Sequence, residues 1–165
     1  MLLARALAAA PIVWLALLAF AASGAGSSFS PSIREFIFAF ASQVCHQQPD
    51  RSFHWGATAW PVCARCLGLY AAAPLGAMLA LAVKTPARIV PARNVLLLGI
   101  AAMPTGVTWV VEHGFGAPLS NGLRFVAALP LGAAIAWLLV RTILATARGG
   151  VSQYTLQDAR RGQVR

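Results

Sequence analysis

The sequence predicts an all-α integral membrane protein, a helical bundle of about four transmembrane helices. Of its 165 residues, 59% are hydrophobic and only 10% are charged, against about 25% charged residues in an average soluble domain. A small soluble domain this apolar would expose large hydrophobic patches and aggregate. Long apolar stretches and an uneven distribution of basic residues support the same prediction.

Four stretches are long and apolar enough to cross a bilayer, which takes roughly 20 mainly apolar residues. They cover residues 6–22, 62–83, 94–111 and 123–144. We predict one transmembrane domain, 1–146, followed by a basic cytoplasmic tail, 147–165. The first stretch also resembles a signal peptide, because small residues that suit cleavage follow it. Its apolar run is longer than a usual signal core, so we expect it to stay as a helix.

Basic residues predict the orientation of the spans. Four lie in the segments that would face one side of the membrane, and nine lie on the side of both termini. Those nine are Arg5, Lys84, Arg88, Arg93, Arg141, Arg148, Arg160, Arg161 and Arg165. Lysine and arginine concentrate in cytoplasmic loops. We therefore predict a multi-pass protein of a bacterial or archaeal cytoplasmic membrane, with both termini in the cytoplasm and the loop 23–61 facing outward.

The outer loop contains a candidate interfacial helix within residues 28–43. Ile33, Phe36, Ile37 and Phe40 recur at helical spacing, as in a helix that lies on a membrane surface. Packing of this face on the other helices is the alternative, and the sequence does not separate the two.

Small residues predict how the second and fourth spans pack. Each span repeats a small residue at every fourth position, which lets helix backbones approach closely in lipid. The residues are Ala64, Gly68, Ala72, Gly76, Ala80, Ala128, Gly132 and Ala136. The same stripes would also serve contact with a partner subunit or a second copy. Nucleic acid is not an expected partner, because the basic residues are scattered between apolar runs.

Reactive side chains concentrate at the outward face. Three cysteines and two histidines lie within 22 residues, and the chain has no other cysteine; they are Cys45, His46, His54, Cys63 and Cys66. The predicted topology brings to the same membrane level Arg51, Arg65, Glu112, His113, Asn121 and Arg124. Ionisable groups near lipid are costly unless they are used, so we predict one functional cluster.

A metal site, with zinc as the expected ion, is the first interpretation of this cluster. Cys63 and Cys66 have the spacing of a zinc knuckle. Cys45 and either His46 or His54 would complete a Cys₃His set. Four protein ligands would make the site structural, whereas three ligands and a water would make it catalytic.

A catalytic site would also need a base and groups that hold a substrate. The candidate bases are Glu112 and His113. A phosphate or carboxylate, on a lipid-borne or other anionic substrate, suits arginine; the candidate anion-binding residues are Arg51, Arg65, Asn121 and Arg124. The sequence leaves open whether the protein is an enzyme.

Thiol–disulfide exchange is the alternative. A Cys-x-x-Cys at a helix N-terminus has its thiolate favoured by the helix dipole, and an outer compartment permits disulfides. The chain resembles in outline small four-helix membrane oxidoreductases that pass electrons to quinone. Those enzymes use a second cysteine pair, whereas only Cys45 remains here. A third interpretation is an accessory subunit of a membrane complex, with a structural metal or disulfide.

Three motifs resemble a known family. They are Cys-His-Gln at 45–47, Arg-Ser-Phe at 51–53 and Cys-Ala-Arg-Cys-Leu-Gly-Leu-Tyr at 63–70. These motifs are similar to those of small prokaryotic membrane proteins grouped as domain of unknown function 2085. Pro104, Ser120-Asn121 and Arg124 also match, while Thr108 stands where the family carries Asp and Leu67 where it carries Thr.

This resemblance covers about residues 42–132 and brings no known function with it. It implies that one site contains Cys45, His46, Arg51, Cys63, Arg65, Cys66, Asn121 and Arg124. His54 and His113 match no position of the family pattern. Glu112, one helical turn after Thr108, is the candidate to replace the missing carboxylate.

Overall fold

The computed structural model of the chain describes residues 2–23, 31–83 and 91–162, with side chains for 5–23, 31–83 and 92–147. The fold is an all-α helical bundle, as the sequence predicts. Four helices of the described part are long and apolar enough to cross a membrane. They are α1 (Leu2–Ala22), α4 (Ala64–Ala82), α5 (Pro91–Gly114) and α6 (Asn121–Gly162).

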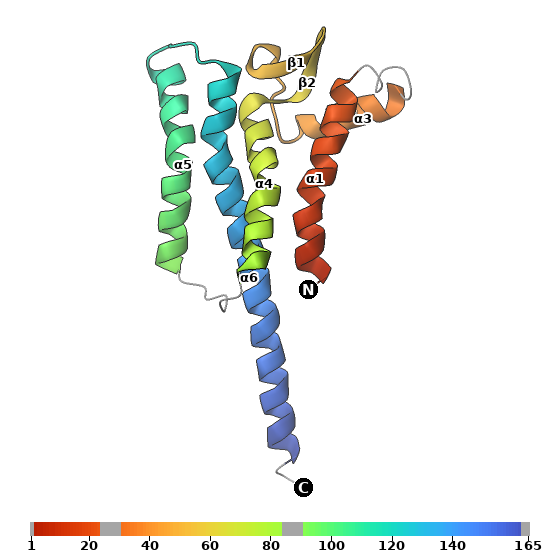
Figure 1. The fold of residues 1–165 in the computed structure, drawn as a ribbon, viewed down its shortest axis with the longest axis vertical. Coiled ribbons are helices and arrows are strands. Elements are labelled where there is room, and N and C mark those ends of the chain that lie inside the picture. Colours follow the sequence, from red (N-terminus) through yellow and green to blue (C-terminus); the bar gives the residue numbers. More distant parts are fainter. Residues whose placement is uncertain (1, 24–30, 84–90, 163–165) are drawn as a thin grey trace.

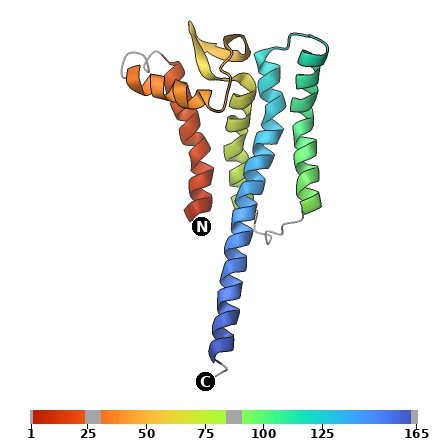
Figure 2. The ribbon, with the colours of Figure 1, turned by 180° about the vertical axis from the view of Figure 1, so that it is seen from behind.

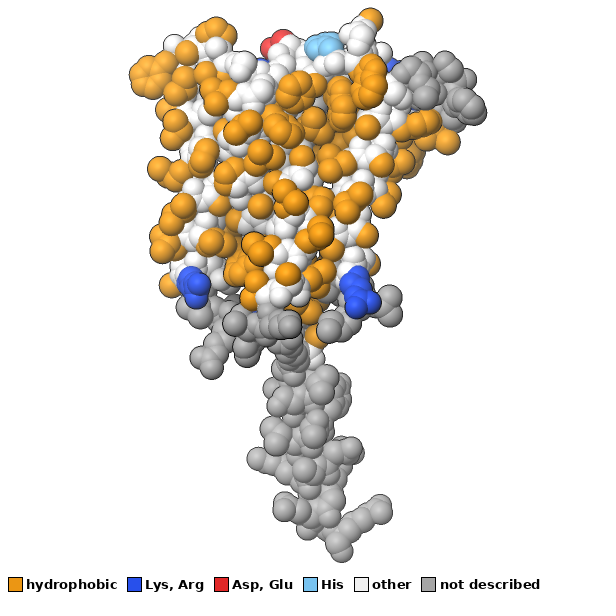
Figure 3. All heavy atoms as spheres, in the orientation of Figure 1, with side chains coloured by type: hydrophobic (Ala, Val, Ile, Leu, Met, Phe, Trp, Pro, Cys, Tyr) orange, Lys and Arg blue, Asp and Glu red, His pale blue; other side chains and the backbone are white. Residues whose placement is uncertain are grey.

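Helices α4 and α6 form the centre of the bundle, with α1 beside α4 and α5 beside α6 (Figures 1 and 2). Both chain termini lie at one end. At that end α6 continues well past the other helices, so most of the segment predicted as a tail is helical. The sides of the bundle carry apolar side chains between the two ends, and basic side chains border them at the end nearest the termini (Figure 3).

The opposite end carries a short helix and a β-hairpin. Helix α3 (Pro31–Ser42) leads through a 3₁₀ turn (Pro49–Arg51) to the antiparallel strands β1 (Ser52–Trp55) and β2 (Thr58–Cys63). The hairpin turns at Gly56, whose φ of 60° lies in the left-handed region that glycine adopts without strain. Our sequence analysis did not predict these strands. Strand β2 runs directly into α4, so the hairpin sets where Cys63 lies.

Helix α3 both packs on the bundle and keeps an exposed apolar face. Ile37 and Ala41 are buried and belong to the side that contacts α1 and β2. Ile33, Phe36 and Phe40 are more than half exposed. The structure therefore contains features of both alternatives that the sequence left open for this helix.

The predicted small-residue stripes meet where α4 crosses α6. A Cβ added at Gly68 or Gly76 of α4 would overlap a backbone carbonyl oxygen of α6, and one added at Gly132 of α6 would overlap that of Leu69. The two backbones are thus in direct contact, which only glycine allows at these positions. Dispersion contacts of this kind are a main source of helix association in lipid.

We predict that Gly76→Ala lowers the free energy of unfolding by about 1–3 kcal/mol, because the added methyl group overpacks the α4–α6 contact. Thermal unfolding of the detergent-purified protein measures this as a drop in Tm of several degrees. Gly99→Ala on α5 is the matched control, since a Cβ there meets nothing within 4 Å. Equal Tm values for the two variants would contradict the close contact.

Candidate functional site

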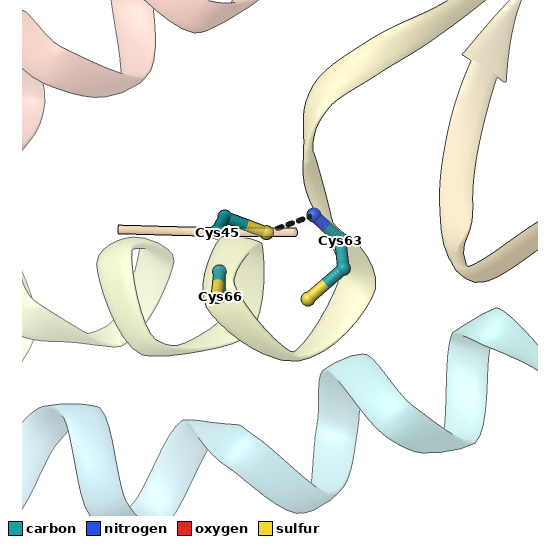
Figure 4. Close-up of side chains that lie close together, drawn as sticks. All are labelled: Cys45, Cys63 and Cys66. Carbon is teal, nitrogen blue, oxygen red and sulfur yellow. Dashed lines mark hydrogen bonds between the residues drawn. The ribbon is translucent and has the colours of Figure 1, made fainter. Parts of the chain in front are cut away.

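The three cysteines meet at the end of the bundle that carries the hairpin. Cys45 follows α3, Cys63 ends β2 and Cys66 lies in the first turn of α4 (Figure 4). Their Sγ atoms all lie within 4.8 Å of one another. Zinc bonds to thiolate at about 2.3 Å, so it holds its sulfurs about 3.8 Å apart in a tetrahedral site. Small side-chain movements would bring the three sulfurs to that spacing, and the cluster fits a metal ion.

Backbone and side-chain hydrogen bonds hold Cys45 in this cluster. The backbone N–H of Cys63 donates to Sγ of Cys45 at 3.1 Å. Gln47 adopts a left-handed φ of 49°. Its Nε2 donates to the carbonyl oxygens of Phe38 at 2.7 Å and Pro61 at 2.9 Å. These bonds tie the cysteine loop to α3 and β2.

The surroundings of Cys63 lower the pKa of its thiol. Hydrogen bonding by the Cys66 side chain is the largest cause that lowers the pKa of Cys63 to about 5, and Cys45 adds to the effect against the cost of burial. Cys63 is also the N-cap of α4, where the helix dipole favours negative charge. The cluster therefore provides a thiolate, the form that binds metals.

A pocket of about 330 Å³ opens beside the cysteines. Its walls come from the cysteine loop, the start of α4, the end of α5 and the start of α6. The lining residues are Val44, Cys45, His46, Gln47, Gln48, Arg51, Cys63, Arg65, Cys66, Trp109, His113 and Arg124. Soft metal ligands and three guanidinium groups thus share one cavity.

A buried ion-pair triad supports the pocket. Arg65 of α4 and Arg124 of α6 both bind the carboxylate of Glu112 at the end of α5, with Nε of Arg124 donating to Oε1 at 2.6 Å. The Glu112 side chain is only 5% exposed and that of Arg124 only 9%. Nε of Arg65 is buried and has no hydrogen-bond partner among the described residues. Two guanidiniums against one carboxylate leave the triad with one net positive charge beside the thiols.

Asn121 connects this triad to the hairpin. Its Oδ1 accepts a hydrogen bond from Nη1 of Arg124 at 2.5 Å, and its Nδ2 donates to the carbonyl oxygen of Ser52 at 2.9 Å. Asn121 is not among the residues that line the pocket. Its contacts therefore link Arg124 of α6 to strand β1.

The predicted histidines lie in three different places. His46 is exposed on the pocket wall, outside the three-cysteine group. His54 is exposed on β1 and does not line the pocket. His113 lines the pocket, with its ring stacked on Trp109 at 4.6 Å between centroids. Its Nδ1 lies 3.0 Å from the Trp109 carbonyl oxygen, which can only accept, so Nδ1 donates this hydrogen bond.

Sequence reasoning missed two contributors to the site. Trp109 forms part of the pocket wall, and its place near the end of an apolar span, where tryptophan is enriched, was an available signal. Gln47 belongs to the Cys-His-Gln motif, but its bonds to two distant carbonyls could not be read from spacing. Thr108, where the family pattern has an acid, is buried and donates to the carbonyl oxygen of Thr105 at 2.9 Å.

We predict that Glu112→Gln destabilises the fold by about 3 kcal/mol, since removing one partner of a buried ion pair leaves uncompensated charge. Denaturant unfolding of the detergent-purified protein measures the change. Asp50→Asn is the control, because Asp50 is 77% exposed and lies 4.0 Å from Arg51; such pairs contribute about 0–1 kcal/mol. Equal losses of unfolding free energy for the two substitutions would show that the buried triad stabilises the fold no more than an exposed ion pair does.

Comparison with known proteins places these features in a family. An uncharacterized protein of Methanothermobacter thermautotrophicus is 32% identical over 95 residues, which are 58% of this chain and 83% of that protein. One of Methanocaldococcus jannaschii is 40% identical over 57 residues, 34% of this chain and 36% of that protein. No solved structure matches the chain significantly. The family model described as "Predicted membrane protein (DUF2085)" matches residues 45–138, more than half of the chain, and the protein therefore belongs to that family.

Proposed function

We propose that this protein is a membrane metalloprotein that binds zinc through Cys45, Cys63 and Cys66 and holds an anionic substrate group in the adjacent pocket. The observation that carries the proposal is the shared cavity. Three sulfurs within 4.8 Å of one another line the same pocket as Arg51, Arg65 and Arg124.

Charge supports zinc as the ion. A divalent cation with three thiolates carries one net negative charge. The triad of Arg65, Glu112 and Arg124 carries one net positive charge at the same membrane end. Each charge reduces the cost of burying the other, which is considerable near lipid. Oxygen-preferring ions such as Mg²⁺ do not suit a thiolate set.

The ligand set favours an open site. The three cysteines leave a fourth tetrahedral position, and His46, the predicted fourth ligand, lies outside their group. When bound with that position open, zinc supplies Lewis acidity and an activated water. The protein supplies the rest: guanidiniums to bind and orient an anion, and Nε2 of His113 to accept a proton. Glu112 is a poor candidate for the base, because both of its oxygens bind arginine.

The position of the site supports a location on the outer face of a cytoplasmic membrane. The cysteine loop lies at the end of the bundle opposite both termini (Figure 1). Basic residues are more numerous on the side of the termini, which is the cytoplasmic side by the positive-inside rule.

Thiol redox chemistry is a second candidate function, favoured by one specific observation. Cys63 caps α4 and has two other sulfurs within reach, so attack of one thiolate on a partner's disulfide could be followed by attack of a second cysteine. The partner would leave as a dithiol and this protein would hold a disulfide, which a quinol or a protein dithiol would reduce by supplying an electron pair. In the reverse direction a quinone would take up the electron pair from the protein's dithiol and restore the disulfide. The absence of a second cysteine pair in the chain makes this the weaker of the two proposals.

We predict about one zinc per chain in the wild-type protein and less than about 0.1 in Cys63→Ser, because removing one of three thiolates leaves too few ligands. Elemental analysis and thiol titration of the same detergent-purified sample measure both. His46→Ala serves as the matched variant and should keep its zinc. Loss of zinc in His46→Ala would show that His46 is the fourth ligand and that the site is a closed Cys₃His site. A wild-type protein that contains a disulfide and no metal would favour the redox alternative.

We predict that Arg51→Gln weakens binding of inorganic phosphate to the zinc-loaded protein at least fivefold, because it removes one guanidinium from the pocket wall. Arg51 pairs only weakly with exposed Asp50, so the substitution should leave the fold intact. Arg93→Gln changes the net charge equally at the other end of α5 and is the control. Equal phosphate affinities in a calorimetric titration of the two variants would contradict an anion pocket.

A further inference from the structure

A second cavity lies along the membrane-spanning part of the bundle. It has a volume of about 440 Å³ and is lined by α1, α4 and α6. Its lining is apolar and includes the small residues Ala10 on α1 and Ala73 and Ala77 on α4. Nothing in the metal-site proposal uses this groove.

The groove continues the line of the cysteine cluster down α4. Cys66, Tyr70, Ala73 and Ala77 follow one another at spacings of four, three and four residues, so they lie on one face of the helix. Cys66 lines the polar pocket, and the other three line the groove. Tyr70 lies one helical turn after Cys66, and its ring meets that of Trp14 edge-on at 6.3 Å and packs on the cluster that includes Cys45.

The length of this stripe fits one leaflet of a bilayer. Eleven residues separate Cys66 from Ala77, a rise of about 16 Å along a helix. A bilayer core is about 30 Å thick, so one leaflet is about 15 Å deep. A chain lying in the groove would therefore have its polar end at the level of the cysteines.

Charge selects the occupant. The polar pocket at the end of the stripe is lined by Arg51, Arg65 and Arg124. Glu112 binds Arg65 and Arg124, and the exposed Asp50 lies 4.0 Å from Arg51. Three guanidiniums thus face two carboxylates. We propose that the groove holds an acyl chain of an anionic membrane lipid, whose phosphate group occupies the arginine-lined pocket beside the cysteines. This inference deepens the proposed function, on which it rests, by naming the substrate class as an anionic lipid of the outer leaflet.

Native mass spectrometry of the zinc-loaded protein, titrated with palmitoyl-oleoyl-phosphatidylglycerol or the matching phosphatidylcholine, tests the proposal. The wild type should bind phosphatidylglycerol at least fivefold more tightly than phosphatidylcholine. Ala73→Phe should weaken phosphatidylglycerol binding at least fivefold, because the added ring fills the groove. Leu75→Phe is the matched control, since Leu75 is 68% exposed on the same helix and does not line the groove.

A second variant and an independent readout keep the outcomes distinct. Ala10→Phe fills the groove from α1 and should reproduce the loss if Ala73→Phe folds poorly. Arg51→Gln should abolish the preference for phosphatidylglycerol over phosphatidylcholine. If neither groove variant changes the lipid affinity, the bound lipid is ordinary boundary lipid, and the inference is overturned. Zinc content is measured on every sample to separate this result from failure of the metal site. A protein that retains zinc but shows no lipid selectivity would contradict the lipid-binding inference and leave the proposed metal site standing.

Discussion

The close approach of α4 and α6 is the contact on which the site depends. Glycines at 68, 76 and 132 let the two backbones touch, and this contact brings the first turns of both helices together. Arg65 and Arg124 then stand near enough to share Glu112 from α5. A wider separation would leave one guanidinium without its carboxylate, at a depth where unpaired charge is costly. The packing of α4 on α6 therefore also determines the ion pairs that surround the pocket.

In the metal centre that we propose, charge compensation would link the triad to the cysteines. A thiolate cluster with a divalent ion would be anionic, and the triad beside it is cationic, so each would lower the cost of burying the other. The hairpin completes the arrangement, because β2 ends with Cys63 at the N-cap of α4. Hydrogen bonds from Gln47 to β2 and from Asn121 to β1 connect the hairpin to the cysteine loop and to α6. Arg65 and Arg124 therefore have two roles at this end of the bundle: they bind Glu112, and they line the pocket.

Features with a regular period were predictable from the sequence. Four apolar spans, the small stripes and the clustering of Cys45, Cys63 and Cys66 all follow from spacing along helices and from topology. The hairpin was not predictable, because short strands gain their stability from contacts with α1 and α3 that are distant in sequence. Glu112 was expected as a base or a replacement acid. Its true environment depends on Arg65, 47 residues away, which no local pattern reveals.

X-ray absorption at the zinc edge of the purified protein is the sharpest test of a zinc site built from three cysteines, because it counts the ligands around the ion. We expect three sulfur atoms at about 2.3 Å and one oxygen or nitrogen in the fourth position. Replacing His46 with alanine should leave that spectrum unchanged. A shell with fewer than three sulfurs, or a protein that binds no zinc while its thiols are reduced, would contradict a metal centre built from these cysteines.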